Sequence, residues 1–522
     1  MKTDLRPITF WCIILLCISC AKEQIEPLGS HVSSDQRSLL DRSEMDEIIR
    51  AQMGERDLFY WKNVDARYIW SAAMQSDQLL SVGFCINGEK DISQEIHRID
   101  MSQAEWRAAK TELLEMVLDI EREARGEAEL SAADILPPHL NSGEWPNFFF
   151  QVSDLRTVEA LRSHPNVRYV EPTGYHLAQQ AQRSDSGCSN EPDHGINAED
   201  YIIDDLGVKI PWNYPLHNIP TAWNTSSGNG IRIGVLDTGI SSDQDNLGEN
   251  FNSGYSEGRS VQRLSTKWSG ALWWADLDSP EDDCGHGTSM SGVACGPWSD
   301  DGNALGVAYN ADLLSIRAVE DVVITTSNES AGVRDALKVA GKRSSVKVIS
   351  MSIGDPFYNS TVADGVYYAH NEGDIILCAA GTSFSITTWY GVVFPATMEE
   401  TLAVTGVTDA SSPQKCASCH DGSEVDFTII MERQSDSDRH PISLAMHSDQ
   451  PSYIGGSSVA TSTLAGITAL VWSAHPGDTR EQIIHRIKLA SEHYPDRHPD
   501  FGWGRVDAAA AVQVNQFPVL LK

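Results

Sequence analysis

Five short apolar runs after residue 207 constrain the fold of this chain more than any other feature. Each is six or seven residues long, with a helical stretch at 331–340 between two of them and another at 462–474 after the last. Such runs are typical of parallel strands that are buried on both faces of a sheet. The pattern predicts an α/β fold with a doubly wound, mostly parallel sheet. The runs are 231–236, 312–317, 346–352, 375–380 and 401–407.

Three short motifs stand in this region in the order Asp, His, Ser. Asp237 lies in VLDTGI, His286 in DDCGHGT and Ser458 in GGSSVAT. A serine hydroxyl is a weak nucleophile until an imidazole takes its proton, and the imidazole needs a carboxylate that fixes its tautomer. The three motifs together predict nucleophilic catalysis. A lone DTG also fits a pepsin-type protease, but the only second candidate, Asp185, lies in a polar segment.

These motifs resemble those of the subtilisin-like serine proteases (subtilases, peptidase family S8), and the resemblance covers about 207–515. Further landmarks are ALGVA at 304–308, FPA at 394–396 and FGWGRVDA at 501–508. The resemblance implies a serine endopeptidase that hydrolyses peptide bonds in proteins or peptides through an acyl-enzyme.

The resemblance also implies roles for single residues. Asp237 orients His286, His286 is the general base, and Ser458 attacks the peptide carbonyl. GSSVA at 456–460 is similar to the family's Gly-Thr-Ser-Met-Ala, which places Ser458 rather than Ser457 at the nucleophile position. The run VISMSIG resembles the strand that lines the substrate cleft, so Ser352 and Gly354 are predicted to bind substrate.

One position departs from the family pattern. The family supplies an Asn to the oxyanion hole from an Ala-Ala-Gly-Asn run, and here the run ends in Thr382. A hydroxyl can also donate a hydrogen bond, so Thr382 is the predicted oxyanion residue. The alternative is a weak or catalytically silent subtilisin fold that acts as a binding protein of the cell envelope.

The N-terminus has the features of an export signal. Lys2 and Arg6 precede an apolar run at 8–20, which is too short to span a bilayer as a helix. The run ends in Ile-Ser-Cys and resembles a bacterial lipobox, so Cys20 is the predicted lipidation site. We expect an exported protein, held at the bacterial cell envelope by this lipid or otherwise secreted, with no other membrane attachment.

The segment between the signal and the α/β region predicts a small α+β, ferredoxin-like domain. Strands are expected at 79–86, 147–152 and 167–171, with room for another near Ile135. The stretch FFFQVSDLRTVEALRSHPNVRYVEP resembles the end of the inhibitory propeptides of subtilases, which makes the chain's own propeptide a predicted partner. The expected organisation is a signal at 1–20, a polar tether and the start of the propeptide at 21–78, a propeptide-like domain at 79–175, a cleavable linker at 176–206 and a catalytic domain at 207–515.

Composition excludes some functions and leaves others open. The formal net charge of −34 argues against nucleic acid as a partner, because phosphate binding needs a basic face. The sequence 416–420 (CASCH) matches a haem c attachment pattern, but it aligns with a surface loop of the family and a disulfide or free thiols are favoured. No cofactor and no metal site is assigned. Calcium stays possible because relatives bind it, although the acidic loop 276–283 has no calcium-loop spacing.

Overall fold

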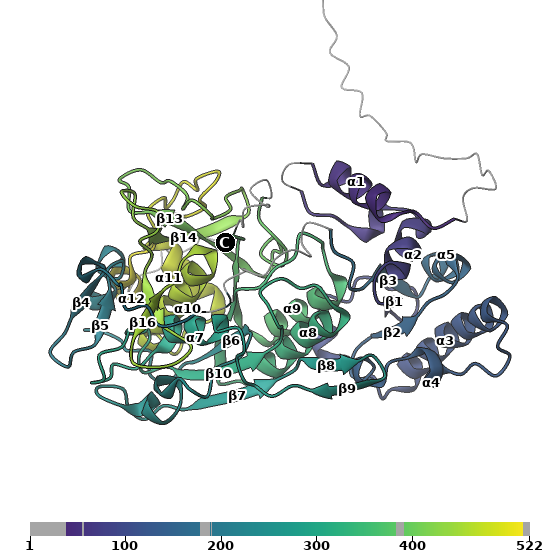
Figure 1. Ribbon diagram of the computed structural model, residues 1–522, viewed down its shortest axis with the longest axis horizontal. Helices are drawn as coiled ribbons and strands as arrows, with labels where there is room; N and C mark the ends of the chain where they lie inside the picture. Colours follow the sequence, from purple (N-terminus) through teal and green to yellow (C-terminus); the bar gives the residue numbers. More distant parts are fainter. Residues whose placement is uncertain (1–37, 55–56, 178–187, 189, 383–390, 515–522) are drawn as a thin grey trace, which may run out of the picture. The chain divides into compact units, whose positions relative to one another are not determined.

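A seven-stranded sheet forms the centre of the C-terminal region, by which we mean the described residues from 190 onward. The structure is a computed structural model and describes residues 38–54, 57–177, 188, 190–382 and 391–514. All neighbouring strands of the sheet run parallel, in the order β14-β13-β12-β11-β6-β10-β7 (Figure 1). The strands are β6 (Arg232–Asp237), β7 (Val261–Ser265), β10 (Asp312–Arg317), β11 (Val346–Met351), β12 (Ile375–Ala379), β13 (Leu402–Thr408) and β14 (Val425–Glu432).

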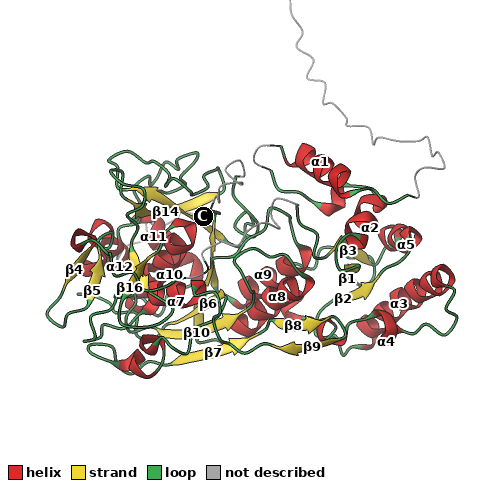
Figure 2. Ribbon diagram, in the orientation of Figure 1, coloured by secondary structure: helices red, strands yellow, loops and turns green. Residues whose placement is uncertain are grey.

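Helices cover both faces of this sheet (Figure 2). Val235 of the inner strand β6 packs in one apolar cluster with residues of α7 (His286–Cys295) and α10 (Gly456–Ala474). Its neighbour Leu236 packs in a second cluster with residues of α8 (Ser327–Gly341) and α9 (Ser360–Glu372). Because successive side chains of a strand point to opposite faces, the two clusters lie on opposite sides of the sheet. The predicted doubly wound α/β fold is confirmed.

The five apolar runs of the sequence correspond to β6, β10, β11, β12 and β13, each within one residue at either end. The two edge strands, β7 and β14, were not among those runs. The sequence of β7 is VQRLS and no residue of it is fully buried, so it lacks the apolar signal of the inner strands. This reason does not apply to β14, which is buried at all but one of its eight residues although it lies at the other edge.

The N-terminal region (described residues 38–177) contains a three-stranded antiparallel sheet in the order β2-β1-β3. No fourth strand occurs in its described residues, because Ile135 ends a short helix, α4, that has a Ser131 capping box. The strands are β1 (Leu79–Phe84), β2 (Asn147–Gln151) and β3 (Val167–Pro172), and the helices are α1 (Arg42–Met53), α2 (Ala66–Met74), α3 (Ala104–Arg125), α4 (Ala132–Ile135) and α5 (Leu155–Ser163).

The segment predicted to hold the polar tether and the start of the propeptide, 21–78, contains two helices that the sequence analysis did not predict. Helices α1 and α2 fall inside 21–78, and Met45, Ile49 and Ile69 are buried in the same apolar cluster as the sheet residues Val82 and Phe148. Their apolar residues recur at helical spacing and are separated by charged ones, so the segment reads as polar on average although one face is buried. The part of the tether before residue 38, with the signal and Cys20, lies outside the described residues.

The predicted linker is joined to the rest of the C-terminal region at a few described residues. Cys188 forms a disulfide with Cys284. Asn190 and Asp200 are buried, and Asp200 receives hydrogen bonds from Arg433, Arg439 and Tyr453. Most other described residues of 191–206 are exposed or partly exposed, and a cleavable linker at 176–206 stays a prediction. Residues 178–187 and 189 lie outside the described residues.

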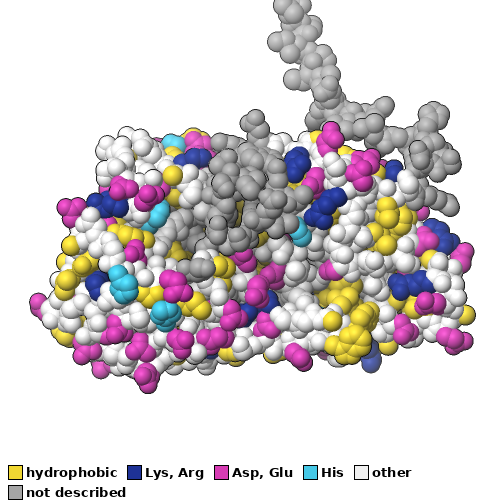
Figure 3. Space-filling model, viewed as in Figure 1, with side chains coloured by type: hydrophobic (Ala, Val, Ile, Leu, Met, Phe, Trp, Pro, Cys, Tyr) yellow, Lys and Arg dark blue, Asp and Glu magenta, His cyan; other side chains and the backbone are white. Residues whose placement is uncertain are grey.

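No described helix has the length and apolar character that a membrane crossing requires. On the face shown in Figure 3, acidic side chains are more frequent than basic ones, as the net charge predicts. The smaller elements of the C-terminal region are α6 (Ile219–Ala222), α11 (Arg480–Leu489), α12 (Ala508–Gln513) and the two-stranded sheets β4–β5 (Tyr201–Ile203, Lys209–Pro211), β8–β9 (Trp268–Ala271, Trp274–Leu277) and β15–β16 (Ile442–Leu444, Pro451–Tyr453).

The buried carboxylate of Asp200 gives a test of this packing. Asp200→Ala leaves Arg433 and Arg439 without their carboxylate, and breaking a buried ion pair in this way costs about 3–5 kcal/mol. We expect a clear fall in the thermal unfolding midpoint of the C-terminal region, measured by calorimetry. Glu199→Ala is the matched control, because the Glu199 side chain is 79% exposed and its loss should cost less than about 1 kcal/mol. Equal midpoints for the two variants would contradict the packing described.

Candidate active site

Asp237 and His286 meet at the carboxyl end of β6, an inner strand of the sheet. Asp237 is the last residue of β6, and His286 is the first residue of α7. The Asp237 Oδ1 and His286 Nδ1 atoms are 2.7 Å apart, and both side chains are buried. Asp237 Oδ1 also accepts a hydrogen bond of 2.8 Å from the backbone N–H of Thr238. The carboxylate is therefore placed to hold the proton of His286 on Nδ1, which leaves Nε2 as the basic nitrogen.

The pKa of His286 is raised by its charged neighbours. Burial works against the imidazolium and would lower the pKa, but the charge of Asp237 and its hydrogen bond outweigh burial. Asp282 and Asp321 raise the pKa further. An imidazole with a raised pKa binds a proton more strongly, which suits a group that must accept one during a reaction.

A close backbone contact fixes the position of α7 against the DTG turn. A Cβ atom on Gly287 would lie 2.4 Å from the carbonyl oxygen of Gly239 and 2.8 Å from its nitrogen. Both are main-chain atoms that cannot swing aside. The residue after His286 therefore has to be glycine for Asp237 and His286 to approach each other.

Ser458 lies in the first turn of α10, and its side chain is partly exposed. The Ser352 hydroxyl donates a hydrogen bond of 3.2 Å to the backbone carbonyl of Ser458, so the predicted cleft residue and the predicted nucleophile are neighbours. Helices α7 and α10 pack against each other in one apolar cluster. Within the described part of the chain, no hydrogen bond joins the Ser458 hydroxyl to His286. The structure thus links Asp237 to His286 directly and places Ser458 on the adjacent helix.

Thr382 contacts Ser457, the residue before Ser458. The Thr382 hydroxyl accepts a hydrogen bond of 3.1 Å from the backbone N–H of Ser457 and shares a second, of 2.9 Å, with the Ser457 hydroxyl. The Ser457 hydroxyl also accepts from the backbone N–H of Gly381. Ser457 is fully buried in this network, which agrees with Ser458 as the exposed member of the pair.

Gly354 lies at an opening between two chain segments. Its N–H donates to the Val322 carbonyl at 3.0 Å, and its carbonyl accepts from the N–H of Ile324 at 3.3 Å. Gly354 is partly exposed, whereas Ser352 is buried. The two predicted cleft residues therefore continue the line of β11 beyond its carboxyl end, next to α10.

Two disulfides lie beside these loops. Cys188–Cys284 ends two residues before His286. Cys416–Cys419 closes the CASCH loop as a disulfide, one of the two states that the sequence left open, and the N–H of His420 donates to the carbonyl of Gly381 at 3.0 Å. The second disulfide thus supports the loop that carries Thr382. The other three cysteines of the described chain, Cys85, Cys295 and Cys378, are buried free thiols.

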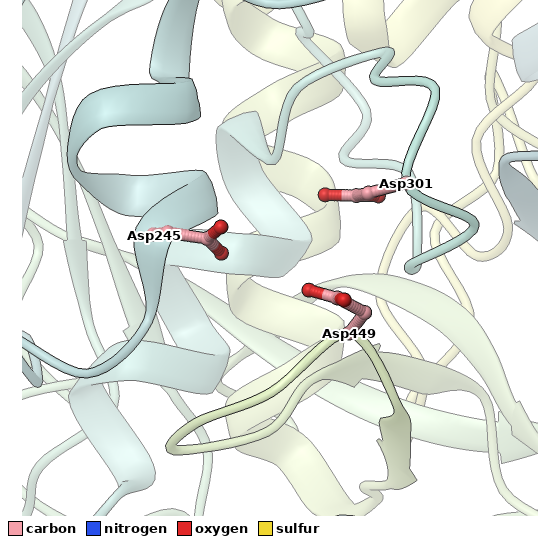
Figure 4. Close-up of side chains that lie close together, drawn as sticks. All are labelled: Asp245, Asp301 and Asp449. Atoms are coloured by element: carbon pink, nitrogen blue, oxygen red, sulfur yellow. The ribbon is translucent and has the colours of Figure 1, made fainter.

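An acidic cluster lies outside the predicted acidic loop. Figure 4 shows the carboxylates of Asp245, Asp301 and Asp449 pointing toward one another from three segments, and their oxygens lie within 4.8 Å of each other. Burial and the charges of Asp245 and Asp301 raise the pKa of Asp449. Carboxylates are the ligands that Ca²⁺ prefers, but Ca²⁺ takes six to eight oxygens, and three acids alone do not define a site. In the predicted loop, Asp278 pairs with Lys267 and Asp283 with Arg317.

Comparison with known proteins agrees with this geometry. The model of the subtilase family (Peptidase_S8) matches residues 228–504, more than half of the 522-residue chain. The matched span includes Asp237, His286, Thr382 and Ser458. The chain belongs to the subtilase family.

Individual relatives identify the class of enzyme. The thermostable alkaline protease of Halalkalibacterium halodurans is 29% identical over 59% of this chain and 75% of its own length. Thermitase of Thermoactinomyces vulgaris is 26% identical over 56% of this chain and 92% of its own. Among solved structures, MycP1 of Mycobacterium smegmatis aligns with a TM-score of 0.48 at 19% identity, over 65% of this chain and 90% of its own. The protein is a serine-type endopeptidase, as the sequence motifs predicted.

The contact at Gly287 generates a test of the site. Gly287→Ala forces the DTG turn and α7 apart, and a displacement of about 1 Å can cost roughly 100-fold in rate. We expect a loss of that order in kcat/KM for hydrolysis of denatured casein. Gly477→Ala is the control, because nothing lies within 4 Å of the added Cβ, and it should retain wild-type activity. Wild-type kcat/KM in Gly287→Ala would show that this contact does not fix the site.

Proposed function

We propose that this protein is an exported serine endopeptidase made as a self-inhibited precursor, with Asp237, His286 and Ser458 as its catalytic triad. The observation that carries the proposal is the 2.7 Å contact between Asp237 and His286 beside the helix that bears Ser458. Protein or peptide substrates follow from the enzyme class. Ser352 and Gly354 are the cleft residues in this proposal.

The proposed reaction moves one proton through His286. The Nε2 atom takes the hydroxyl proton of Ser458 as the oxygen attacks the peptide carbonyl, and Asp237 stabilises the imidazolium. His286 then gives the proton to the leaving amine, which leaves an acyl-enzyme on Ser458. A water molecule attacks this ester in the same way, with His286 as base, and the acid product leaves as Ser458 regains its proton.

In this proposal, hydrogen-bond donors at the start of α10 and on Thr382 stabilise the oxyanion. Backbone N–H groups at a helix N-terminus favour a developing negative charge, and the Ser458 N–H is one of them. The Thr382 and Ser457 hydroxyls share one hydrogen bond, so only one of their two hydrogens is used between them. With Ser457 as the donor of that bond, the Thr382 hydrogen is left for a substrate oxygen, and this arrangement favours an active enzyme over the silent binding protein considered as the alternative.

Polar contacts between the N-terminal region and helices α8 and α9 support its role as a propeptide. The Trp145 indole N–H donates to Asp335 Oδ1 at 2.7 Å, and the Trp145 side chain is buried. Arg168 forms two hydrogen bonds, of 2.5 and 3.1 Å, with Asp364. The Ser81 and Thr361 hydroxyls are 2.8 Å apart. Buried charge pairs and a buried indole are features of specific, desolvated interfaces.

The segment that precedes α2 pairs with the chain just after the predicted cleft residues. The Phe59 N–H donates to the Pro356 carbonyl at 3.2 Å, and its carbonyl accepts from the Tyr358 N–H at 2.9 Å. Pro356 lies two residues after Gly354. Main-chain pairing of this kind adds an extended segment to an edge of the enzyme, as substrates of many proteases do. This contact supports inhibition of the cleft by the N-terminal region.

Export and lipidation rest on the sequence of the first 20 residues. The proposed location is the bacterial cell envelope, with a lipid on Cys20 as the only membrane attachment, or secretion if Cys20 is not modified. Two disulfides among the described residues are consistent with an oxidising compartment.

Intact mass over time tests the proposed self-cleavage. The purified wild-type precursor should lose its N-terminal region, because Ser458 can attack the chain's own linker. The Ser458→Ala precursor should keep its full mass under the same conditions. Ser473→Ala, in the last turn of the same helix α10, is the matched control: it keeps the nucleophile and should still be processed. Equal stability of the wild-type and Ser458→Ala precursors, together with no casein hydrolysis, would favour the silent-fold alternative.

The buried Glu171 predicts a pH-dependent precursor. Glu171 accepts hydrogen bonds from the N–H and hydroxyl of Ser360 at the start of α9. Burial raises its pKa to about 7, with Asp364 adding to the rise and Lys62 opposing it. A group with a raised pKa stabilises the folded contact below its ordinary pKa, and that stability is lost as the pH rises through about 7.

Glu171→Gln should remove this dependence. In the Ser458→Ala background, we expect the Gln variant and its parent to unfold at the same temperature near pH 5. Above pH 7 the parent should be the less stable of the two, by about 3 kcal/mol. Glu159→Gln, at an exposed position of α5, is the control and should follow the parent at every pH. A pH-independent difference between Glu171→Gln and its parent would contradict the prediction.

A further inference from the structure

We propose that Asp282 is a positioning residue that holds Asp237 and His286 in register, an inference that rests on the catalytic roles proposed above. Asp282 lies four residues before His286 and its side chain is 0% exposed. In the described part of the chain no Lys, Arg or His forms an ion pair with it. A buried carboxylate without a basic partner needs hydrogen bonds to offset its desolvation, and the donors it uses show what it holds.

Five hydrogen bonds surround the Asp282 carboxylate. Its Oδ1 atom accepts from the Thr238 hydroxyl at 2.8 Å, the Cys284 N–H at 3.0 Å and the Gly285 N–H at 2.8 Å. Its Oδ2 atom accepts from the N–H and the hydroxyl of Thr288, at 2.8 and 2.7 Å. Cys284 and Gly285 precede His286 and Thr288 follows it. Hydrogen bonds to one carboxylate therefore hold the chain on both sides of the imidazole.

The same carboxylate reaches the loop of Asp237. Thr238 directly follows Asp237 and donates its own N–H to Asp237 Oδ1 at 2.8 Å. The Thr238 hydroxyl, which donates to Asp282, also accepts from the Gly287 N–H at 2.9 Å. Asp282, Thr238 and Gly287 therefore form a continuous bridge between the residue after the triad carboxylate and the residue after the triad imidazole.

The charge of Asp282 has a second consequence that can be measured. Asp237, Asp282 and Asp321 all act on His286 and raise its pKa, while burial opposes them. Removing the charge of Asp282 lowers that pKa, so the acidic limb of a pH–rate profile moves to lower pH. A residue that only stabilised the fold would not move this limb.

The test is Asp282→Asn in the full chain, with kcat and KM for a fluorogenic peptide measured from pH 5 to 9. The Asn side chain replaces one acceptor oxygen by an N–H that faces other donors, so the bridge breaks. We expect kcat to fall roughly 100-fold, KM to stay within about twofold, and the acidic limb to move to lower pH. Wild-type kcat with an unmoved limb would overturn the proposal.

Asp283→Asn is the matched control. It removes the same charge one residue further along, from a side chain that is 70% exposed and pairs with Arg317. We expect wild-type kcat and an unmoved limb. A loss in this variant equal to that of Asp282→Asn would show that the charge of the loop matters and the bridge does not.

Thr238→Val keeps the charge of Asp282 and removes only the hydroxyl that links it to Gly287. It therefore tests the bridge even if Asp282→Asn does not fold. Its kcat should fall while the acidic limb stays in place, and Thr238→Ser, which retains the hydroxyl, should restore kcat. Full kcat in Thr238→Val would overturn the bridge.

A signal that does not depend on turnover separates this inference from the proposed function. In Ser458→Ala protein, the low-field proton resonance of His286 Nδ1–H should be present. Adding Asp282→Asn should abolish it or lower its titration midpoint. If Asp282→Asn changes the resonance but the wild-type protein hydrolyses no peptide, the positioning role is retained and the proposed catalysis is rejected. An unchanged resonance would reject the positioning role.

Discussion

Burial of a parallel sheet on both faces is the constraint on which the rest of this structure depends. The inner strands have no solvated face, so polar side chains can emerge only where the strands end. Asp237 ends β6, Ser352 follows β11 and Thr382 lies three residues after β12, all at the carboxyl edge. Helices α7 and α10 pack on one face of the sheet and start at that same edge, which brings His286 and Ser458 to it.

Much of this could be predicted from the sequence, because the information is local. Inner strands are continuous apolar runs, and the residues of the site stand in short motifs whose spacing the fold preserves. The edge strand β7 lacks such a run, and its place depends on pairing with β10, about 50 residues further along the chain. Helices α1 and α2 were missed for a related reason. Each buries only one side against the N-terminal sheet, and the average polarity of the segment hides that side.

The details of the site depend on contacts between distant segments and could not be derived in the same way. Asp282 stands in a motif that the sequence singles out, but its role depends on Thr238, 44 residues earlier. The pairing of Thr382 with Ser457 joins residues 75 positions apart. Sequence reasoning identified Thr382 as a departure from the family and could not determine what its hydroxyl contacts. The periodicity of a sequence reports on residues that are close in the chain, whereas these hydrogen bonds form only when distant segments come together in the folded protein.

Because Cys188 and Cys284 form a disulfide, it matters whether the backbone is cut before or after Cys188. A backbone cut before Cys188 leaves the N-terminal region with no covalent link to the rest, whether or not a reductant is present. A cut after Cys188 leaves the two pieces joined, with the upstream piece fastened two residues from His286. Once this bond has formed, the position of a cut relative to one sulfur atom decides whether the enzyme parts from its N-terminal third or remains a two-chain molecule.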